Sequence, residues 1–331
     1  MLRFGLLGAG RIGQVHGPNI AASPDATLAA VADVDNKAAS ALAEKTGASV
    51  REATQILSAG DIDAVLIGSP TDTHADYIEA AARSGKAVLC EKPVDLASAR
   101  VEACLQVVEQ AGIPLMIGFN RRFDPNFAAL QKRVAQGVIG RVEIVTVISR
   151  DPGPPPISYI ERSGGLYRDM MIHDFDIVRF MLGEEPVELT AYGSALVDPA
   201  IGEAGDVDTA LVILKTASGK LAQISNSRRA AYGYDQRIEV HGSDGMARAD
   251  NIHETTVEIA GHHGFTGDPV RHFFLERYAE AYRLELAAFI DAVSRGVPPS
   301  PSGRDGLRAQ LLADAATESR RTGRPVAVPL D

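Results

Sequence analysis

A short polar group of residues in an apolar segment could carry acid–base chemistry. Asp169, His173 and Asp176 are spaced four and three residues apart among Met, Ile, Phe and Val residues. The segment ends at Gly183, a good helix terminator, so we expect one helix with the three side chains on one face. An imidazole titrates near neutral pH and can accept and return a proton there. A lone histidine would be interpreted as a core residue, but a carboxylate one turn away favours a functional site.

A lysine at the end of an apolar run could act in the same chemistry. Lys92 lies between Glu91 and Pro93, directly after Ala87–Cys90. Ligands bind at the carboxyl ends of the strands in doubly wound parallel sheets. Strand-end lysines are usually just solvated, but Pro93 disfavours a helical conformation for Lys92 and restricts how the amine is presented.

A glycine-rich turn near the N-terminus has the parts of a dinucleotide site. Gly8, Gly10 and Gly13 form the pattern G-x-G-x-x-G directly after an apolar run and before a helical stretch. In such a turn the first glycine permits a tight bend, the second lets a pyrophosphate approach, and the third lets helix and strand pack closely. Free N–H groups at the helix start then face the anion.

One carboxylate indicates which dinucleotide is bound. Asp33 falls 20 residues after Gly13, at the end of the second apolar run. A carboxylate there can accept both hydrogen bonds of an adenosine ribose. No arginine follows it, and the only nearby cation is Lys37, so we expect NAD rather than NADP.

The elements that must position these residues divide the chain into two halves. The first half alternates short apolar strands with helices, which predicts right-handed crossovers and a doubly wound parallel sheet, the Rossmann fold. The expected strands are Arg3–Leu7, Leu28–Asp33, Ala64–Gly68, Ala87–Cys90 and Leu115–Gly118, and the expected helices include Asn36–Lys45, Thr73–Ser84 and Ala97–Gln110. We place this domain at residues 1–122.

Residues 123–331 have the pattern of an α+β domain with a large, mainly antiparallel open sheet. Consecutive strands with short turns carry this prediction. The expected strands are Val142–Ser149, Val207–Thr216, Lys220–Ser227, Arg237–His241 and Thr255–Ile259. Two long helices, Phe273–Ser294 and Asp305–Arg321, precede a strand-like tail, Pro325–Leu330, that should pack back on an earlier element.

Length and composition exclude several classes of protein. The chain has 331 residues, enough for about two domains, with 45% hydrophobic and 23% charged residues, as in ordinary globular proteins. Its net charge of −10, with no cationic run, argues against nucleic acid and anionic membranes as partners. No stretch of 18 apolar residues is present, and Cys90 and Cys104 lie in apolar segments, so we expect a cytoplasmic protein.

Three motifs in this order and spacing resemble one known family. They are Gly8–Gly13, Glu91-Lys92-Pro93 and Gly165-x3-Asp169-x3-His173-Asp174. Together they are similar to the glucose-fructose oxidoreductase/inositol dehydrogenase/rhizopine catabolism family, over the whole chain. The stretch Ser149–Asp176 resembles the bacterial inositol 2-dehydrogenases of that family.

The resemblance implies an activity and its catalytic residues. The activity is NAD-dependent oxidation of a cyclic polyol, foremost myo-inositol to 2-keto-myo-inositol (scyllo-inosose). Lys92, Asp169 and His173 match the family's catalytic positions. His173 would take the hydroxyl proton, Lys92 would hold the reacting oxygen, and Asp169 would orient one of them; the division between Lys92 and His173 stays open.

The resemblance and the turn together give the expected binding residues. For the cofactor they are Gly8, Gly10, Arg11, Ile12, Gly13, Asp33, Ser69, Pro70, Thr71, His74, Glu91 and Lys92. For the substrate they are Lys92, Asn120, Arg122, Asp169, His173 and Tyr234. We expect no metal site.

Other functions remain open from the sequence. The same hydride chemistry could act on another inositol isomer or an aldose. A metal-dependent sugar isomerase or hydrolase could use Asp169, His173 and Asp176, and a silent NAD-binding regulator could retain the fold. From the resemblance we also expect a homodimer or homotetramer that associates through the antiparallel sheet, with Ala210, Val212, Ala222 and Ile224 as candidates on either face.

Overall fold

The computed structural model describes residues 1–330, which form two compact units. The first comprises Met1–Phe123 and Glu280–Gln310, and the second comprises Asp124–Ala279 and the chain from Leu311 onward. The sequence prediction placed everything after residue 122 in the second domain, so Glu280–Gln310 differs. Its apolar residues explain the difference, because Leu286 and Phe289 lie in the same buried cluster as Phe4 of the first strand.

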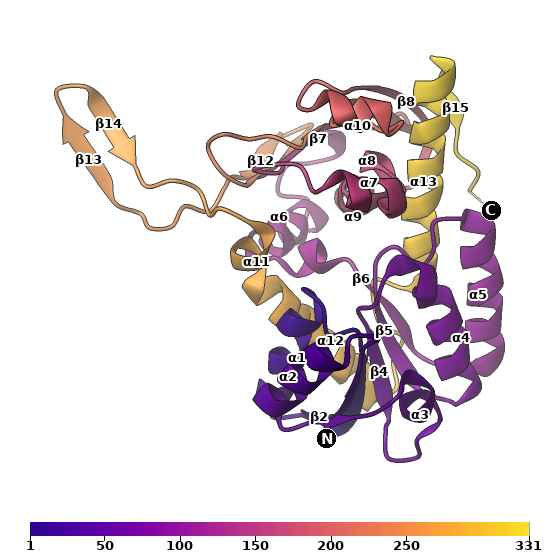
Figure 1. Ribbon diagram of the computed structural model, residues 1–331. Coiled ribbons are helices and arrows are strands. Elements are labelled where there is room, and N and C mark those ends of the chain that lie inside the picture. The colour runs from indigo at the N-terminus through magenta and orange to yellow at the C-terminus, as the bar shows by residue number, and fades with distance from the viewer. Residues whose placement is uncertain (331) are drawn as a thin grey trace. The chain divides into compact units, whose positions relative to one another are not determined.

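The first unit is built on a six-stranded parallel sheet (Figure 1). Its strands, in the order β3-β2-β1-β4-β5-β6, are β1 (Leu2–Leu7), β2 (Ala26–Ala32), β3 (Ser49–Val50), β4 (Ala64–Ile67), β5 (Ala87–Glu91) and β6 (Leu115–Gly118). The predicted doubly wound sheet is confirmed. Only β3 was missed, because both its residues are exposed and form no apolar run.

Helices connect these parallel strands. They are α1 (Gly13–Ala22), α2 (Asn36–Thr46), α3 (Ala53–Ser58), α4 (His74–Arg83) and α5 (Ser98–Ala111), with short 3₁₀ turns η1 (Thr71–Thr73) and η2 (Asn120–Phe123). α12 (Ala279–Arg295) and the first part of α13 (Gly303–Thr322) complete the unit. α2 and α5 each end at a left-handed glycine, Gly47 and Gly112, the residue type that adopts this conformation most readily.

The second unit contains a seven-stranded sheet in which one neighbouring pair, β7 and β10, is parallel and the others are antiparallel. Its strands, in the order β12-β11-β7-β10-β9-β8-β15, are β7 (Val142–Arg150), β8 (Pro186–Ser194), β9 (Thr209–Thr216), β10 (Leu221–Ser227), β11 (Asp235–Gly242), β12 (Gly245–Ala249) and β15 (Val326–Ala327). The mainly antiparallel sheet is thus confirmed. So is the returning tail, since β15 pairs with β8.

A separate hairpin, β13 (Glu258–Gly261) and β14 (Gly264–Gly267), extends from the second unit (Figure 1). The sequence prediction of a strand at Thr255–Ile259 overlaps β13 only at its end. β8 was missed altogether, because it starts with a proline and carries Gly193 near its end.

The helices of the second unit correct two predictions. They are α6 (Pro125–Ala135), α7 (Ile157–Ser163), α8 (Leu166–Asp169), α9 (Ile172–Leu182), α10 (Pro199–Glu203), α11 (Phe274–Arg277) and the remainder of α13. The expected continuous helix through Asp169 and His173 is two helices, because the Met171 N–H bonds five residues back to Leu166 and the winding becomes irregular. The expected helix Phe273–Ser294 is likewise divided, at Tyr278, which leaves the helical conformation.

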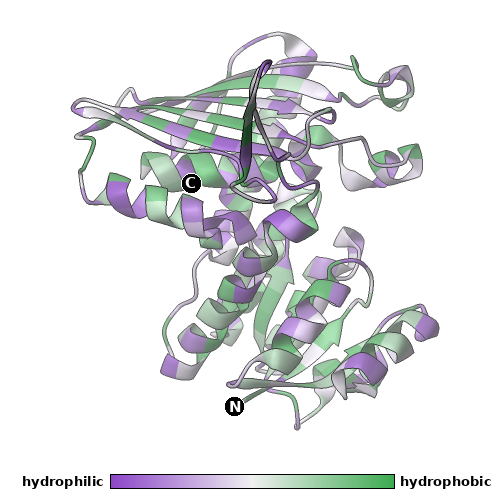
Figure 2. Cartoon of the chain, turned by 90° about the vertical axis from the view of Figure 1, so that its left-hand side faces the viewer, coloured by the Kyte–Doolittle hydropathy of each residue, from purple (hydrophilic) through white to green (hydrophobic). Residues whose placement is uncertain are grey.

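The seven-stranded sheet has one covered face and one open face. On β9 and β10 the residues Ala210, Val212, Ala222 and Ile224 are all buried, which assigns them to the covered face. Several residues on the other face are exposed and apolar: Leu211 at 58%, Ile213 at 57% and Leu221 at 41% on β9 and β10, and Tyr192 at 65% on β8. In Figure 2 the strands of this sheet carry green, hydrophobic segments beside purple, hydrophilic ones. None of the helices within residues 1–330 is long and apolar enough to cross a membrane.

Candidate active site

Two glycines shape the turn between β1 and α1. Gly8 has a φ of +105°, and a Cβ atom there would lie 2.6 Å from the carbonyl carbon and oxygen of Gly68. A Cβ on Gly13 would lie 2.1 Å from the carbonyl oxygen of Gly8. Both positions therefore require glycine for reasons internal to the protein.

Gly10 requires a different explanation. A Cβ atom there would meet no protein atom within 4 Å, and the residue is exposed. Next to it, α1 begins without a side-chain cap, since Ile12 stands at the N-cap. An uncapped helix start beside an open glycine fits a pyrophosphate bound by backbone N–H groups. Arg11 is exposed at the same turn.

Asp33 is held against this turn. Its Oδ2 accepts a hydrogen bond of 2.6 Å from the Ala9 N–H, and its Oδ1 accepts one of 2.8 Å from the Asp35 N–H. The half-buried carboxylate is therefore fixed at the end of β2, beside the glycines. Each oxygen retains a further lone pair, so the group can still accept from ribose hydroxyls.

The segment after β4 is held by a buried histidine. Both ring nitrogens of His74 lie 2.8 Å from carbonyl oxygens, Nδ1 from that of Pro93 and Nε2 from that of Ser69. His74 is 1% exposed and uses both ring nitrogens in these contacts. It therefore links the chain after β4 to the chain after β5. Ser69 in turn shares a 2.6 Å hydrogen bond with Thr73, which fixes the approach to Pro70 and Thr71.

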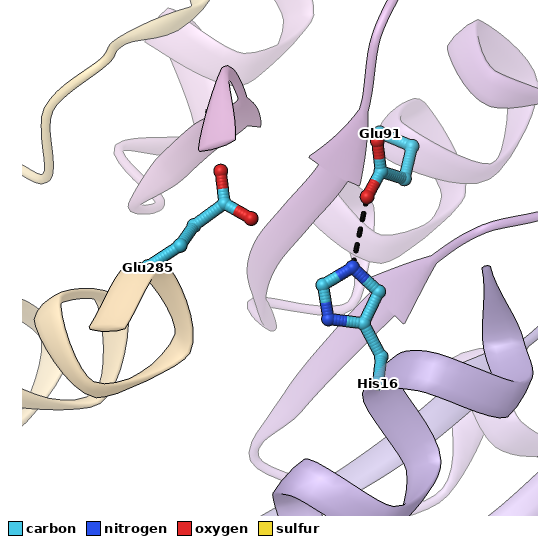
Figure 3. A group of neighbouring side chains, drawn as sticks. All are labelled: His16, Glu91 and Glu285. Atoms are coloured by element: carbon cyan, nitrogen blue, oxygen red, sulfur yellow. Dashed lines mark hydrogen bonds and ion pairs between the residues drawn. The ribbon is translucent and has the colours of Figure 1, made fainter. Parts of the chain in front are cut away.

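At the end of β5 the neighbours Glu91 and Lys92 differ in their surroundings. The Glu91 carboxylate turns inward and lies 2.8 Å from Nε2 of His16 (Figure 3). Lys92 is half-buried and follows the strand. Since the strands of this sheet are parallel, the Gly-rich turn, Asp33, Ser69 and Lys92 all lie at its carboxyl edge. The structure thus brings together most of the expected cofactor residues.

Contacts within the first unit restrict the side chains of the two expected substrate residues that follow β6. Asn120 is 2% exposed. The guanidinium of Arg122 donates a 2.9 Å hydrogen bond to Oδ1 of Asp305, on α13. Asp305 also caps the start of that helix through Ser302.

In the second unit, Asp169 is surrounded by two residues that the sequence did not indicate. Its Oδ1 accepts a 2.9 Å hydrogen bond from the hydroxyl of Tyr159, and its Oδ2 lies 3.3 Å from a guanidinium nitrogen of Arg228. Arg228 is almost fully buried, at 1% exposure. Tyr159 and Arg228 lie on separate elements, so no local spacing could have identified them.

His173 lies half-buried in the first turn of α9, just after the break that separates it from Asp169. Asp176 lies three residues further along the same helix. It is fully buried and pairs with Arg179 at 3.3 Å. The predicted alignment of all three residues on one helix therefore fails at Asp169, because the break at Met171 separates it from His173 and Asp176, which both lie in α9.

Tyr234 packs in an aromatic group. It is 5% exposed, and its ring meets Tyr278 edge-on with centroids 5.9 Å apart, and Phe273 at 6.3 Å. Gly233, with a φ of +117°, sets the turn that directs it there.

The models of two domains of one protein family together match most of the chain. Residues 2–119 match the oxidoreductase family's NAD-binding Rossmann fold, and residues 131–328 match its C-terminal alpha/beta domain. The chain belongs to the Gfo/Idh/MocA oxidoreductase family. It is 56% identical over 327 residues to an inositol 2-dehydrogenase of Rhizobium meliloti, covering 99% of each protein.

Solved structures of the family agree with this assignment. A scyllo-inositol dehydrogenase from Lactobacillus casei with bound NAD(H) and scyllo-inositol is 30% identical, with a TM-score of 0.92 and 99% of each chain covered. A myo-inositol dehydrogenase from the same organism, in complex with NAD(H) and myo-inositol, is 26% identical with a TM-score of 0.90, covering 100% of this chain and 98% of that one.

Family membership decides the class of chemistry. The protein is an NAD-dependent oxidoreductase, and the glycine-rich turn with Asp33 fits that cofactor. The metal-dependent isomerase hypothesis gains no support. Among residues 1–330, the group of three side chains that could share a metal is His16, Glu91 and Glu285, which includes neither Asp169 nor His173.

Proposed function

We propose that this protein oxidises one ring hydroxyl of an inositol to a ketone, foremost myo-inositol to 2-keto-myo-inositol (scyllo-inosose). The observation that carries the proposal is full-length likeness to an inositol 2-dehydrogenase, together with the Lys92, Asp169 and His173 motifs. An uncharged polyol also suits a protein with a net charge of −10, which need not attract an anion.

We assign catalysis to Lys92, Asp169 and His173. When NAD⁺ is bound, its nicotinamide accepts the hydride from the ring carbon. His173 takes the hydroxyl proton, and the Lys92 ammonium stabilises negative charge that develops on the reacting oxygen. Asp169 receives hydrogen bonds from Tyr159 and Arg228, which set the orientation of its carboxylate.

We assign the remaining expected residues, except Glu91, to binding. The pyrophosphate and ribose belong to the Gly8–Gly13 turn, with Arg11 and Ile12, and to Asp33; Ser69, Pro70 and Thr71 border the nicotinamide. His74 holds this segment in place through its hydrogen bonds to the carbonyl oxygens of Ser69 and Pro93. Asn120, Arg122 and Tyr234 contact substrate hydroxyls.

We also propose that the protein works in the cytoplasm as a dimer or tetramer. Two free, buried cysteines suit a reducing compartment. The apolar residues on the open face of the seven-stranded sheet suit an interface with a second copy.

Steady-state kinetics with NAD⁺ and a panel of cyclitols and aldoses tests the substrate. We expect the highest kcat/KM with myo-inositol, and full turnover after exhaustive chelation. A preference for scyllo-inositol would keep the chemistry and change the isomer. Oxidation of glucose with every inositol inert would refute the proposal.

A further inference from the structure

Three side chains of the first unit converge on the end of β5 (Figure 3). His16 comes from α1, Glu91 is the last residue of β5, and Glu285 comes from α12. One potential ligand atom from each lies within 4.8 Å of the other two. We refer to these three residues as the His16 cluster.

Glu285 is the unusual member of the His16 cluster. It is 0% exposed, and neither of its carboxylate oxygens has a hydrogen-bond partner among the described residues. Its carboxylate points toward His16 and Glu91 (Figure 3). Burial raises the pKa of Glu285 well above its usual range, and the neighbouring charge of Glu91 raises that pKa further.

The other groups that face the cluster do not supply a positive charge to Glu285. From α12, the ring of Tyr282 meets His16 edge-on, with centroids 5.4 Å apart. Cys90 precedes Glu91 in β5, so its side chain lies on the opposite face of the sheet; burial and the charge of Glu91 raise the pKa of its thiol. β6 contributes the backbone of Gly118. Two ionised carboxylates here would repel each other in a low-dielectric site, so one proton is retained.

Glu91 is held from two sides. His16 lies 2.8 Å from its Oε1. On the other side lies Gly118 of β6. A Cβ atom at this position would lie 3.0 Å from Oε2 and 3.2 Å from Cα of Glu91, so a side chain there would crowd Glu91. Because Lys92 follows Glu91 directly, whatever fixes Glu91 also fixes the start of the lysine backbone.

We propose that Glu285 of the His16 cluster carries a proton, and that the cluster thereby positions the end of β5 and Lys92. The proton leaves one negative charge, on Glu91, which the hydrogen bond to His16 holds in place. His16, Glu91 and Glu285 are then positioning residues. The link to Lys92 rests on the proposed function, whereas the proton on Glu285 does not.

The geometry favours a proton over a metal ion. Two ligands of a tetrahedral ion at about 2.1 Å are roughly 3.4 Å apart. The His16 and Glu91 atoms lie closer, at 2.8 Å, and form a hydrogen bond with each other.

Difference infrared spectroscopy of the full-length protein tests the proton directly. At pH 7 we expect the carbonyl-stretch band of a protonated carboxylic acid, lost in Glu285→Gln and retained in Glu280→Gln. Glu280 is a matched control, because it lies on the same helix but is exposed and paired with Arg283. Absence of the band in the wild type at pH 7 would overturn the proposal.

The pH dependence of stability gives a second readout. A folded-state pKa above the unfolded value stabilises the fold at low pH, and this stabilisation disappears as pH rises through the folded-state pKa. The Tm of Glu285→Gln minus that of the wild type should therefore increase by about 2–4 °C from pH 5 to pH 9. A difference that stays constant with pH would count against a proton on Glu285.

Kinetics test the positioning role. We expect Glu91→Gln and Glu285→Ala to lower kcat at least about tenfold while the Kd for NADH changes less than about threefold. Glu285→Gln, which imitates the protonated acid, should recover most of the kcat lost in Glu285→Ala. A change in the Kd for NADH with kcat preserved would make Glu91 a cofactor contact instead.

Elemental analysis tests whether a metal ion, and not a proton, occupies the His16 cluster. If the purified protein held one metal ion per chain and Glu285→Gln lost it, the cluster would bind a cation and the proposal of a proton on Glu285 would be overturned. If the protein turned over no inositol, the infrared and stability results would still decide the proton, so the two proposals can fail separately.

Discussion

At the scale of single residues, the cofactor site depends on a carboxylate whose position is set by the backbone. Asp33 accepts N–H groups from Ala9 and Asp35, which fixes it beside the glycine-rich turn. A fixed negative charge at the ribose favours two hydroxyl donors and repels a 2′-phosphate. We therefore expect the choice of NAD over NADP to depend on this one side chain.

Replacing Asp33 with serine should relax that choice. We expect the ratio of kcat/KM for NAD⁺ to that for NADP⁺ to fall at least about tenfold in Asp33→Ser, because the repulsion is removed. Asp35→Ser is the control: Asp35 caps α2 in the same loop. An unchanged ratio in Asp33→Ser would mean that the ribose is recognised elsewhere.

Lys92 gives the second residue-scale prediction. Lys92→Ala should lower kcat with inositol at least about a hundredfold, because a charged group that stabilises the developing alkoxide is lost. The Kd for NADH, followed by its fluorescence, should change little. Exposed Lys132→Ala should behave as the wild type, and ordinary turnover in Lys92→Ala would remove the lysine from the mechanism.

At the scale of elements, the β1–α1 turn separates two roles that the glycine pattern combines. A Cβ atom added at Gly8 or Gly13 would lie 2.6 Å or 2.1 Å from backbone atoms, whereas one added at Gly10 would meet none within 4 Å. Gly8 and Gly13, the first and third glycines, thus allow the strand and helix to pack. Gly10 leaves space for a ligand.

Alanine substitutions should distinguish these roles. Gly13→Ala should lower the Tm by about 4 °C or more, since overpacking against backbone typically costs about 2 kcal/mol or more. Gly10→Ala should keep the Tm within about 1 °C of the wild type, yet weaken NADH binding at least about tenfold. Thermal unfolding with and without NADH measures both. Equal loss of stability in the two variants would contradict this division.

At the scale of the whole molecule, the largest unexplained feature is the open face of the seven-stranded sheet. Along β9 the exposed apolar Leu211 and Ile213 alternate with buried apolar residues, so this strand has the nearly continuous apolar pattern of a strand covered on both faces. A sheet of this kind in a monomer would leave Leu211 and Ile213 in water.

Charges on this face should disrupt association. We expect the double variant Leu211→Asp/Ile213→Asp to weaken self-association at least about a hundredfold, measured by light scattering after gel filtration, because each leucine or isoleucine contributes about 1.5–3 kcal/mol when buried. Val138→Asp is the control, since Val138 is 62% exposed but lies outside the sheet. An unchanged association state in the double variant would place the interface elsewhere.

Much of this protein could be predicted because the relevant signals are local. Runs of apolar residues in β1, β2, β4, β5 and β6, glycine helix ends and the G-x-G-x-x-G turn depend on the backbone's own preferences, so the sequence alone determined the parallel sheet, the cofactor turn and the class of chemistry. Where local winding deviates, the prediction was wrong: the break between Asp169 and His173 comes from irregular hydrogen bonds at Met171.

Only the tertiary structure decided which distant side chains meet. It pairs Asp169 with Tyr159 and Arg228, uses Asp176 as an internal counter-ion and joins His74 to two carbonyl groups. It also assigns Glu280–Gln310 to the first unit and thereby carries Glu285 to His16 and Glu91. These contacts depend on packing between segments as many as 269 residues apart, and no spacing along the chain encodes such packing.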